Sequence, residues 1–144
     1  MRNYWLKVVG MGKSGKPIQD DWKKYANGRL TRVVEFPGNP KKVRAGDGVV
    51  LYAAYHPRVI FAAGDLRSQP YHGPNSSPDY PWFVDVVWDD DATLEFVHFG
   101  VPLSDIGVEG RRVMRQSHIA LTEDEFRAAV RALRRAKATR EEAN

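Results

Sequence analysis

Aromatic and basic residues lie close together in a short segment near the start of the 144-residue chain. Trp22 and Tyr25 are three positions apart and would share one face of a helix, and Lys23, Lys24 and Arg29 lie beside them. Stacking rings next to cations that neutralise phosphate are what binding of an unpaired nucleic-acid base requires. The same pattern also fits a helix with one face in the core and one in solvent. The sequence leaves both interpretations open.

The basic residues are concentrated in the first third of the chain. Residues 1–45 hold eleven Lys or Arg against three Asp or Glu, whereas residues 46–122 hold five against ten. This asymmetry is typical of a protein with a polyanionic partner. A solvated surface gives the same pattern, so the charge distribution is an indication that other observations must support.

A glycine- and lysine-rich stretch, residues 10–17, follows the first predicted strand. It lacks the spacing of a phosphate-binding loop, because Lys7 stands where the first glycine of that motif would have to be. A loop of this composition can still contact phosphates without sequence specificity. The candidate phosphate contacts are Lys13, Lys16, Lys23 and Lys24.

No pattern in the sequence indicates a catalytic or metal centre. The chain has no cysteine, which excludes disulfides, thiol catalysis and cysteine-ligated zinc. The four histidines are not paired at the spacing of metal ligands, and no serine lies in a nucleophile elbow. Asp89-Asp90-Asp91 lacks the other ligands of a cation-binding loop, so we expect a tight turn there. We therefore expect a binding module without a cofactor rather than an enzyme.

The clearest structural pattern is a β-hairpin at residues 49–66. Two nearly continuous apolar runs are separated by His56-Pro57-Arg58 and preceded by the turn signal Gly46-Asp47. Continuous rather than alternating apolar residues indicate strands covered on both faces, as in a small closed or half-closed barrel. Further strands are predicted at residues 4–9, 31–36, 82–88, 93–99 and 112–119.

Helices are predicted near both ends of the chain. A short one is expected between residues 20 and 28, and a longer one begins where Thr122 and Glu125 fit a capping box. With six or seven strands, these elements predict an α+β domain over residues 1–138 and a frayed tail at 139–144.

The order of these elements resembles the EVE domain, a family of the PUA-like superfamily that is related to YTH and ASCH domains. Each motif behind the resemblance is short, and their order and spacing together make the match. The motifs are Tyr4-Trp5-Leu6-Lys7, Gly46-Asp47 with Tyr52, Phe61 to Ser68 with Pro70, and Met114 to Ser117 leading into Leu121 to Phe126.

The resemblance implies a PUA-like mixed β-barrel with flanking helices that recognises a base, modified or unmodified, in an aromatic pocket. The partner would be DNA or RNA, either single-stranded or with a flipped base. The chain departs from the family at Ala53-Ala54, where His-Ser is common, and at residues 28–31, where a Trp-Gly pair is common. The expected ligand-binding residues are Trp22, Tyr25, Arg29, Tyr55, His56, Arg115 and His118.

Two further expectations concern the alternative function and the compartment. The rival class is a small-molecule-binding or hydrolytic PUA-like domain with no nucleic-acid partner. No segment approaches the roughly 18 consecutive apolar residues of a membrane span, and the first residues do not follow the pattern of a signal peptide. We therefore expect a cytoplasmic protein without a membrane partner.

Overall fold

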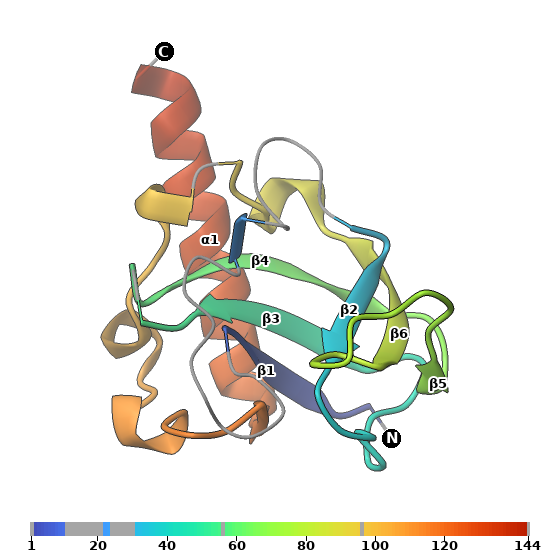
Figure 1. The fold of residues 1–144 in the computed structure, drawn as a ribbon. Coiled ribbons are helices and arrows are strands. Elements are labelled where there is room, and N and C mark those ends of the chain that lie inside the picture. The colour runs from blue at the N-terminus through green and yellow to red at the C-terminus, as the bar shows by residue number, and fades with distance from the viewer. Residues whose placement is uncertain (1, 11–21, 24–30, 56, 96, 144) are drawn as a thin grey trace.

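A curled mixed sheet with one long helix across one face forms the body of the structure (Figure 1). The structure is a computed structural model that describes residues 2–10, 22–23, 31–55, 57–95 and 97–143. The strands are β1 (Tyr4–Val9), β2 (Val33–Phe36), β3 (Gly48–Ala53), β4 (Val59–Leu66), β5 (Tyr71–His72), β6 (Trp82–Trp88) and β7 (His118–Leu121). The 3-10 turns are η2 (Asp90–Ala92), η3 (Val97–Phe99), η4 (Leu103–Ile106) and η5 (Gly110–Arg112), and the helix is α1 (Glu123–Ala143).

The strands pair in the order β2-β6-β4-β3-β1-β7, and the short β5 also pairs with β6. β1 and β3 run parallel, and the other neighbours are antiparallel. The sheet curls into a half-barrel whose two edges are β2 and β7 (Figure 1). This arrangement confirms the predicted α+β class, the strand number and the hairpin of β3 and β4.

Two apolar clusters explain why the central strands are apolar without alternation. Successive side chains of a strand point to opposite faces, so Leu6 of β1 packs in the cluster that includes Leu133 of α1. Trp5 packs in the other cluster, with Phe36 of β2. Every residue of β3 is buried. The expectation that both faces of the hairpin are covered is confirmed.

The Gly46-Asp47 turn joins the starts of the two parallel strands. Gly46 has a φ of +94°, which a residue without a Cβ adopts without strain. The Asp47 carboxylate is 2% exposed. It accepts hydrogen bonds from the Asn3 amide at 3.1 Å, the Trp5 indole at 2.8 Å and the Arg44 amide at 2.9 Å. One buried carboxylate therefore satisfies three donors from two segments.

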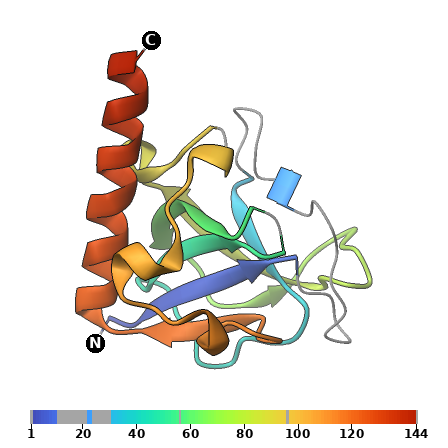
Figure 2. The same ribbon diagram turned by 90° about the vertical axis from the view of Figure 1, so that its left-hand side faces the viewer.

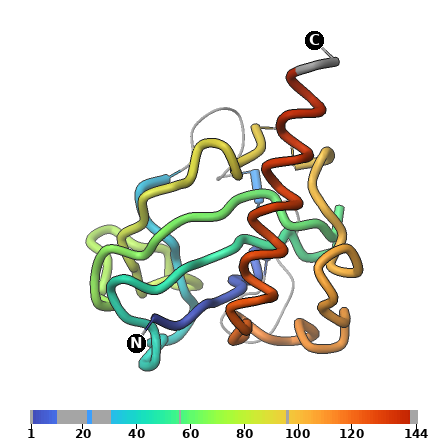
Figure 3. Tube along the Cα trace, turned by 180° about the vertical axis from the view of Figure 1, so that it is seen from behind, coloured from blue at the N-terminus to red at the C-terminus, as the bar shows by residue number. Residues whose placement is uncertain are grey.

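The helix α1 begins with the predicted capping box. The Thr122 amide donates to Oε1 of Glu125 at 2.9 Å, and the Glu125 amide donates to Oγ1 of Thr122 at 3.1 Å. Figure 3, which views the molecule from behind, shows the helix lying across one face of the sheet. The helix continues to Ala143, and the frayed tail expected at 139–144 stays a prediction.

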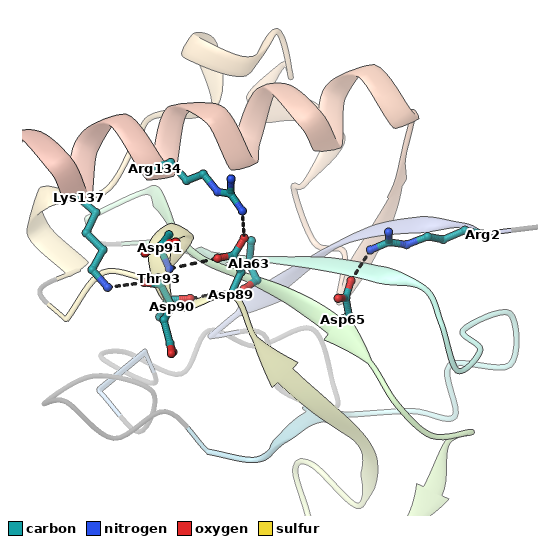
Figure 4. A network of polar contacts seen from close by, with 9 residues as sticks. All are labelled: Arg2, Ala63, Asp65, Asp89, Asp90, Asp91, Thr93, Arg134 and Lys137. Carbon is teal, nitrogen blue, oxygen red and sulfur yellow. Dashed lines mark hydrogen bonds and ion pairs between the residues drawn. The ribbon is translucent and has the colours of Figure 1, made fainter.

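A polar network attaches the C-terminal half of α1 to η2 (Figure 4). The Arg134 guanidinium lies 2.8 Å from the Asp89 carboxylate, and the Lys137 ammonium donates to the carbonyl of Asp90. Asp89 also accepts from the Asp91 amide at 3.1 Å and so caps η2. The three aspartates therefore form a capped turn that binds the helix. Among the described residues, no group of three His, Asp or Glu is arranged to hold a metal ion.

Two predicted strands differ from the structure. Residues 93–99 were expected to form a strand, but residues 93–95 form no regular element and η3 covers residues 97–99. β6 already pairs with β4 and β2, so no edge of β6 is open to the returning chain. The strand expected at 112–119 is the shorter β7, which begins only at His118 because η5 and a turn precede it. None of the helices within the described residues has both the length and the apolar composition needed to cross a bilayer.

Candidate functional site

A pocket of about 790 Å³ opens where β1 and β3 end, beside the segment that leads into β7. This volume is in the range of small-ligand sites. Two residues of the expected site, Tyr55 and Arg115, line it although they are 60 positions apart in the chain. Arg58, Tyr52 and Met114 line it as well.

The turn between β3 and β4 supplies one wall of the pocket. Ala54 donates its backbone amide to the carbonyl of Val9 at 3.0 Å and thereby fixes the ends of the parallel strands side by side. The Arg58 amide donates to the Ala53 carbonyl at 3.0 Å and closes the turn. Tyr55 and Arg58 therefore project from a short, hydrogen-bonded turn rather than from a long loop.

Residues 110–117 supply the opposite wall. The buried side chain of Val113 anchors this segment in the cluster beneath α1. Arg112 connects it to the helix through an ion pair with Glu125 at 2.5 Å. Met114 and Arg115 follow these two anchors, which hold them at the pocket.

The backbone of the pocket is conformationally strained. Tyr55, Arg58 and Arg115 have φ values of +69°, +63° and +58°, in the left-handed region that favours glycine. They are three of the four non-glycine residues with positive φ in the described part of the chain. Such conformations cost of order 1–3 kcal/mol each and cluster at functional sites. Their convergence on one pocket is the strongest indication of a site in this fold.

The pocket combines positive charge with aromatic and apolar surface. Arg58 and Arg115 contribute two guanidinium groups, and no carboxylate is among the described residues that line it. Tyr55 is 39% exposed and Met114 is 65% exposed. Burial raises the pKa of Tyr52, which the charge of Arg58 partly opposes, so this phenol stays neutral near pH 7. The site suits a ligand with a planar group and a negative charge.

Trp22 does not lie at this pocket. Its side chain is 8% exposed and belongs to the apolar cluster that includes Phe36, with its ring 5.4 Å from that of His98. No described residue accepts a hydrogen bond from its indole nitrogen. Trp22 is packed as a core side chain, so its use as a stacking platform stays a prediction that its burial does not favour. Lys23, the next residue, is exposed.

His118 packs inside the curl of the sheet rather than in the pocket. Its ring lies 5.5 Å from that of Trp5 and 5.2 Å from that of Phe36. Burial, reinforced by the charge of Lys7, lowers the pKa of His118 to about 4. The imidazole is therefore neutral near pH 7. Its Nδ1 lies 2.7 Å from Oγ of Ser117.

Lys7 is a buried charged residue that the sequence interpretation did not include in the site. Its side chain is 1% exposed, and its ammonium donates to the Val8 carbonyl at 2.6 Å. The ammonium also lies 5.3 Å from the ring centroid of Phe36 and 5.7 Å from that of Tyr80. The only signal in the sequence is a lysine inside an otherwise apolar strand.

The structure does not place all of the expected site residues. Arg58 and Met114 line the pocket but were not among the expected site residues. Their one signal in the sequence is that Arg58 lies three positions after Tyr55 and Met114 directly precedes Arg115. The expected residues that lie outside the described part of the chain are Lys13, Lys16, Lys24, Tyr25, Arg29 and His56.

Solved structures share the fold at low sequence identity. Rpa0253 from Rhodopseudomonas palustris is 16% identical over 90% of this chain and 92% of its own, with a TM-score of 0.51. Atu2648 from Agrobacterium tumefaciens is 16% identical over 91% and 92%, with a TM-score of 0.51. A hypothetical protein from Leishmania major is 15% identical over 100% and 98%, with a TM-score of 0.53. No family model and no curated protein matches the chain. The structural likeness therefore defines the curled-sheet fold alone.

Proposed function

We propose that this protein is a nucleic-acid-binding module of the EVE and PUA-like kind, which holds one nucleotide in the pocket at Tyr55, Arg58 and Arg115. The observation that carries the proposal is the convergence of two guanidinium groups and a tyrosine, all on left-handed backbone, around one pocket. A strained backbone persists where the surrounding structure holds it, and here it presents three side chains to the same space.

The chemistry of these side chains matches the two parts of a nucleotide. Arginine presents several N–H donors in a planar fork that binds phosphate with two parallel hydrogen bonds. The exposed ring of Tyr55 offers a surface on which a base can stack, an interaction worth about 1–3 kcal/mol per base. The excess of Lys and Arg in residues 1–45 supports a polyanionic partner as well.

The direct test is titration of fluorescein-labelled 12-nucleotide DNA and RNA single strands, followed by anisotropy at 50 mM and 150 mM salt. Because each arginine contributes to phosphate binding, we expect Arg58→Ala and Arg115→Ala each to weaken binding by about tenfold. Arg127→Ala is the matched control, since Arg127 is exposed on α1 and paired with Glu123. Equal effects of all three substitutions, or no binding by the wild-type protein, would contradict the proposal.

The rival function, a small-molecule-binding or hydrolytic domain, gives a different pattern in the same experiment. A pocket for a free small molecule would respond to mononucleotides or nucleosides by a saturable rise in melting temperature. It would show no affinity for the labelled strands at either salt concentration. Binding of the strands with loss on Arg115→Ala favours the nucleic-acid function.

A further inference from the structure

A second pocket, of about 690 Å³, lies between α1 and the segment that carries η3 and η4. Phe99, Pro102 and Asp105 line it from that segment, and Arg135 and Arg140 line it from the helix. Figure 2 shows the segment running beside the helix. Small side chains at positions 132 and 136 of α1 make room for this groove.

Positive charge dominates the groove side of the helix. Asp105 is the one carboxylate among its described lining residues, against the guanidinium groups of Arg135 and Arg140. Exposed Arg131 lies one helical turn before Arg135, and neither forms an ion pair with another described residue. On another side of α1, Asp89 and the carbonyl of Asp90 already bind Arg134 and Lys137 (Figure 4).

The groove also contains an aromatic surface. Phe99 is 46% exposed, although the guanidinium carbon of Arg140 lies 3.9 Å from its ring centroid. Aromatic rings and guanidinium planes are the two kinds of surface on which unpaired bases stack. Basic residues near a helix C-terminus are favourable in themselves because they complement the helix dipole. That effect accounts for Arg140 in the last turn, but not for Arg131 and Arg135 further back or for the exposed phenylalanine beside them.

The turn η4 lines both this groove and the nucleotide pocket, the pocket at Tyr55, Arg58 and Arg115. Leu103 of η4 lines the nucleotide pocket, whereas Pro102 and Asp105 line the groove. A strand bound in the nucleotide pocket can therefore reach the groove by crossing one short turn. Arginines lie on both sides of that turn.

We propose that the groove is the continuation of the binding site, in which the neighbouring nucleotides of a single strand contact Arg131, Arg135 and Phe99. The inference rests on the proposed function and adds that the ligand is a strand of several nucleotides rather than one nucleotide. Arg131 and Arg135 neutralise phosphates, and Phe99 with Arg140 stacks one further base.

The test compares strands of 2 and 12 nucleotides in the wild-type protein and in the double variant Arg131→Ala/Arg135→Ala. The wild type should bind the longer strand at least about tenfold more tightly. In the double variant the affinity for the 12-mer should fall about tenfold, and its salt slope should fall by about 1.4, since each phosphate contact on a single strand contributes about 0.7. Binding of the 2-mer should be unchanged. Phe99→Ala should also weaken the 12-mer selectively.

A control double variant, Arg127→Ala/Arg67→Ala, removes the same charge from exposed positions that line neither pocket and lie outside the basic residues 1–45. If the control weakens the 12-mer as much as the groove variant does, the effect is one of net charge and the inference is wrong. It is equally wrong if the wild type binds both lengths alike while Arg115→Ala still weakens binding about tenfold. Failure of the wild type to bind either length would overturn the proposed function together with this extension.

Discussion

His118 of β7 packs edge-on against Phe36 of β2, with 5.2 Å between the ring centroids and 89° between the ring planes. These two strands are the opposite edges of the sheet. Lys7 reaches the same ring, with its ammonium 5.3 Å from the centroid. Side chains rather than backbone hydrogen bonds therefore join the two edges of the half-barrel at this point.

The burial of His118 predicts a pH dependence of stability. Its pKa is about 4 in the folded protein, against about 6.5 in the unfolded chain. Between these two pKa values the unfolded state binds more protons than the folded state. The contribution of His118 to the free energy of unfolding is therefore complete above pH 6.5 and is lost as the pH falls toward 4. The loss should reach up to about 3 kcal/mol in the free energy of unfolding. Urea denaturation from pH 4 to 8 measures it.

The variant His118→Gln isolates this contribution from that of the carboxylates, which titrate in the same range. Glutamine cannot take up a proton, so the difference between wild type and variant should shrink as the pH falls from 6.5 to 4. A constant difference over this range would show that His118 is not the titrating group.

The Asp47 carboxylate should be important for stability, because it satisfies the buried Trp5 indole and two partly buried backbone amides. Asp47→Ala leaves these donors without an acceptor and should cost about 3 kcal/mol of unfolding free energy. Asp47→Asn keeps one acceptor oxygen and should cost less. The exposed Asp79 is the control, since Asp79→Ala should change stability by under about 0.5 kcal/mol. Thermal and urea denaturation of the three variants give the comparison.

Much of the fold could be predicted from the sequence because local patterns and tertiary structure agree. β1 and β6 have the predicted bounds, and the capping box at Thr122 forms as expected. The strand expected at 93–99 does not form, because a strand needs a free neighbour and a local pattern does not show which edges are occupied. β7 is shorter than the expected strand at 112–119 because η5 and a turn occupy the first part of that segment.

The candidate site was less predictable than the fold. Tyr55 and Arg115 were among the expected ligand-binding residues, Arg115 through the EVE resemblance, and the structure brings them to one pocket. Nothing in the residue types indicates that Tyr55, Arg58 and Arg115 have left-handed backbone, because that region favours glycine. Whether Trp22 faces solvent or the core depends on packing of distant segments, which a three-residue spacing does not reveal.

Trp22 should behave as a core residue in mutagenesis. Because its side chain is 8% exposed, Trp22→Ala should leave a cavity and cost about 3–5 kcal/mol of unfolding free energy. Trp22→Phe should cost less. The affinity for the 12-nucleotide strand, measured well below the melting transition, should be unchanged by Trp22→Phe. A nearly unchanged melting temperature with a large loss of affinity would instead place Trp22 in the binding site.

Tyr55 should behave as a binding residue. The loss of a stacking ring in Tyr55→Ala should weaken strand binding by about 1–3 kcal/mol, which is about 5- to 150-fold. Tyr55→Phe keeps the ring and should bind nearly as well as the wild type. Stability should change little in either variant because the side chain is 39% exposed. Anisotropy titration and thermal unfolding of the same samples separate the two effects.

The strain at Arg115 predicts that Arg115→Gly is more stable than Arg115→Ala, although both variants lose strand binding. Arg115 has a φ of +58°. Alanine keeps the Cβ that is unfavourable in this region, whereas glycine does not. Arg115→Gly should therefore be more stable than Arg115→Ala by about 1 kcal/mol, after allowance for the greater freedom of glycine in the unfolded chain. Both variants should lose strand binding to the same extent, because both remove the guanidinium.

The same pair of substitutions at Arg127 provides the control for this prediction. Arg127 is an exposed residue within α1, where glycine is less favourable than alanine by about 1 kcal/mol. Arg127→Gly should therefore be the less stable of its pair, the reverse of the order at Arg115, and neither variant should affect binding. Urea denaturation of the four variants checks the reversal. If the glycine variant is the less stable of the pair at both positions, the backbone at Arg115 is not strained. The link between strain and binding at this pocket is then lost.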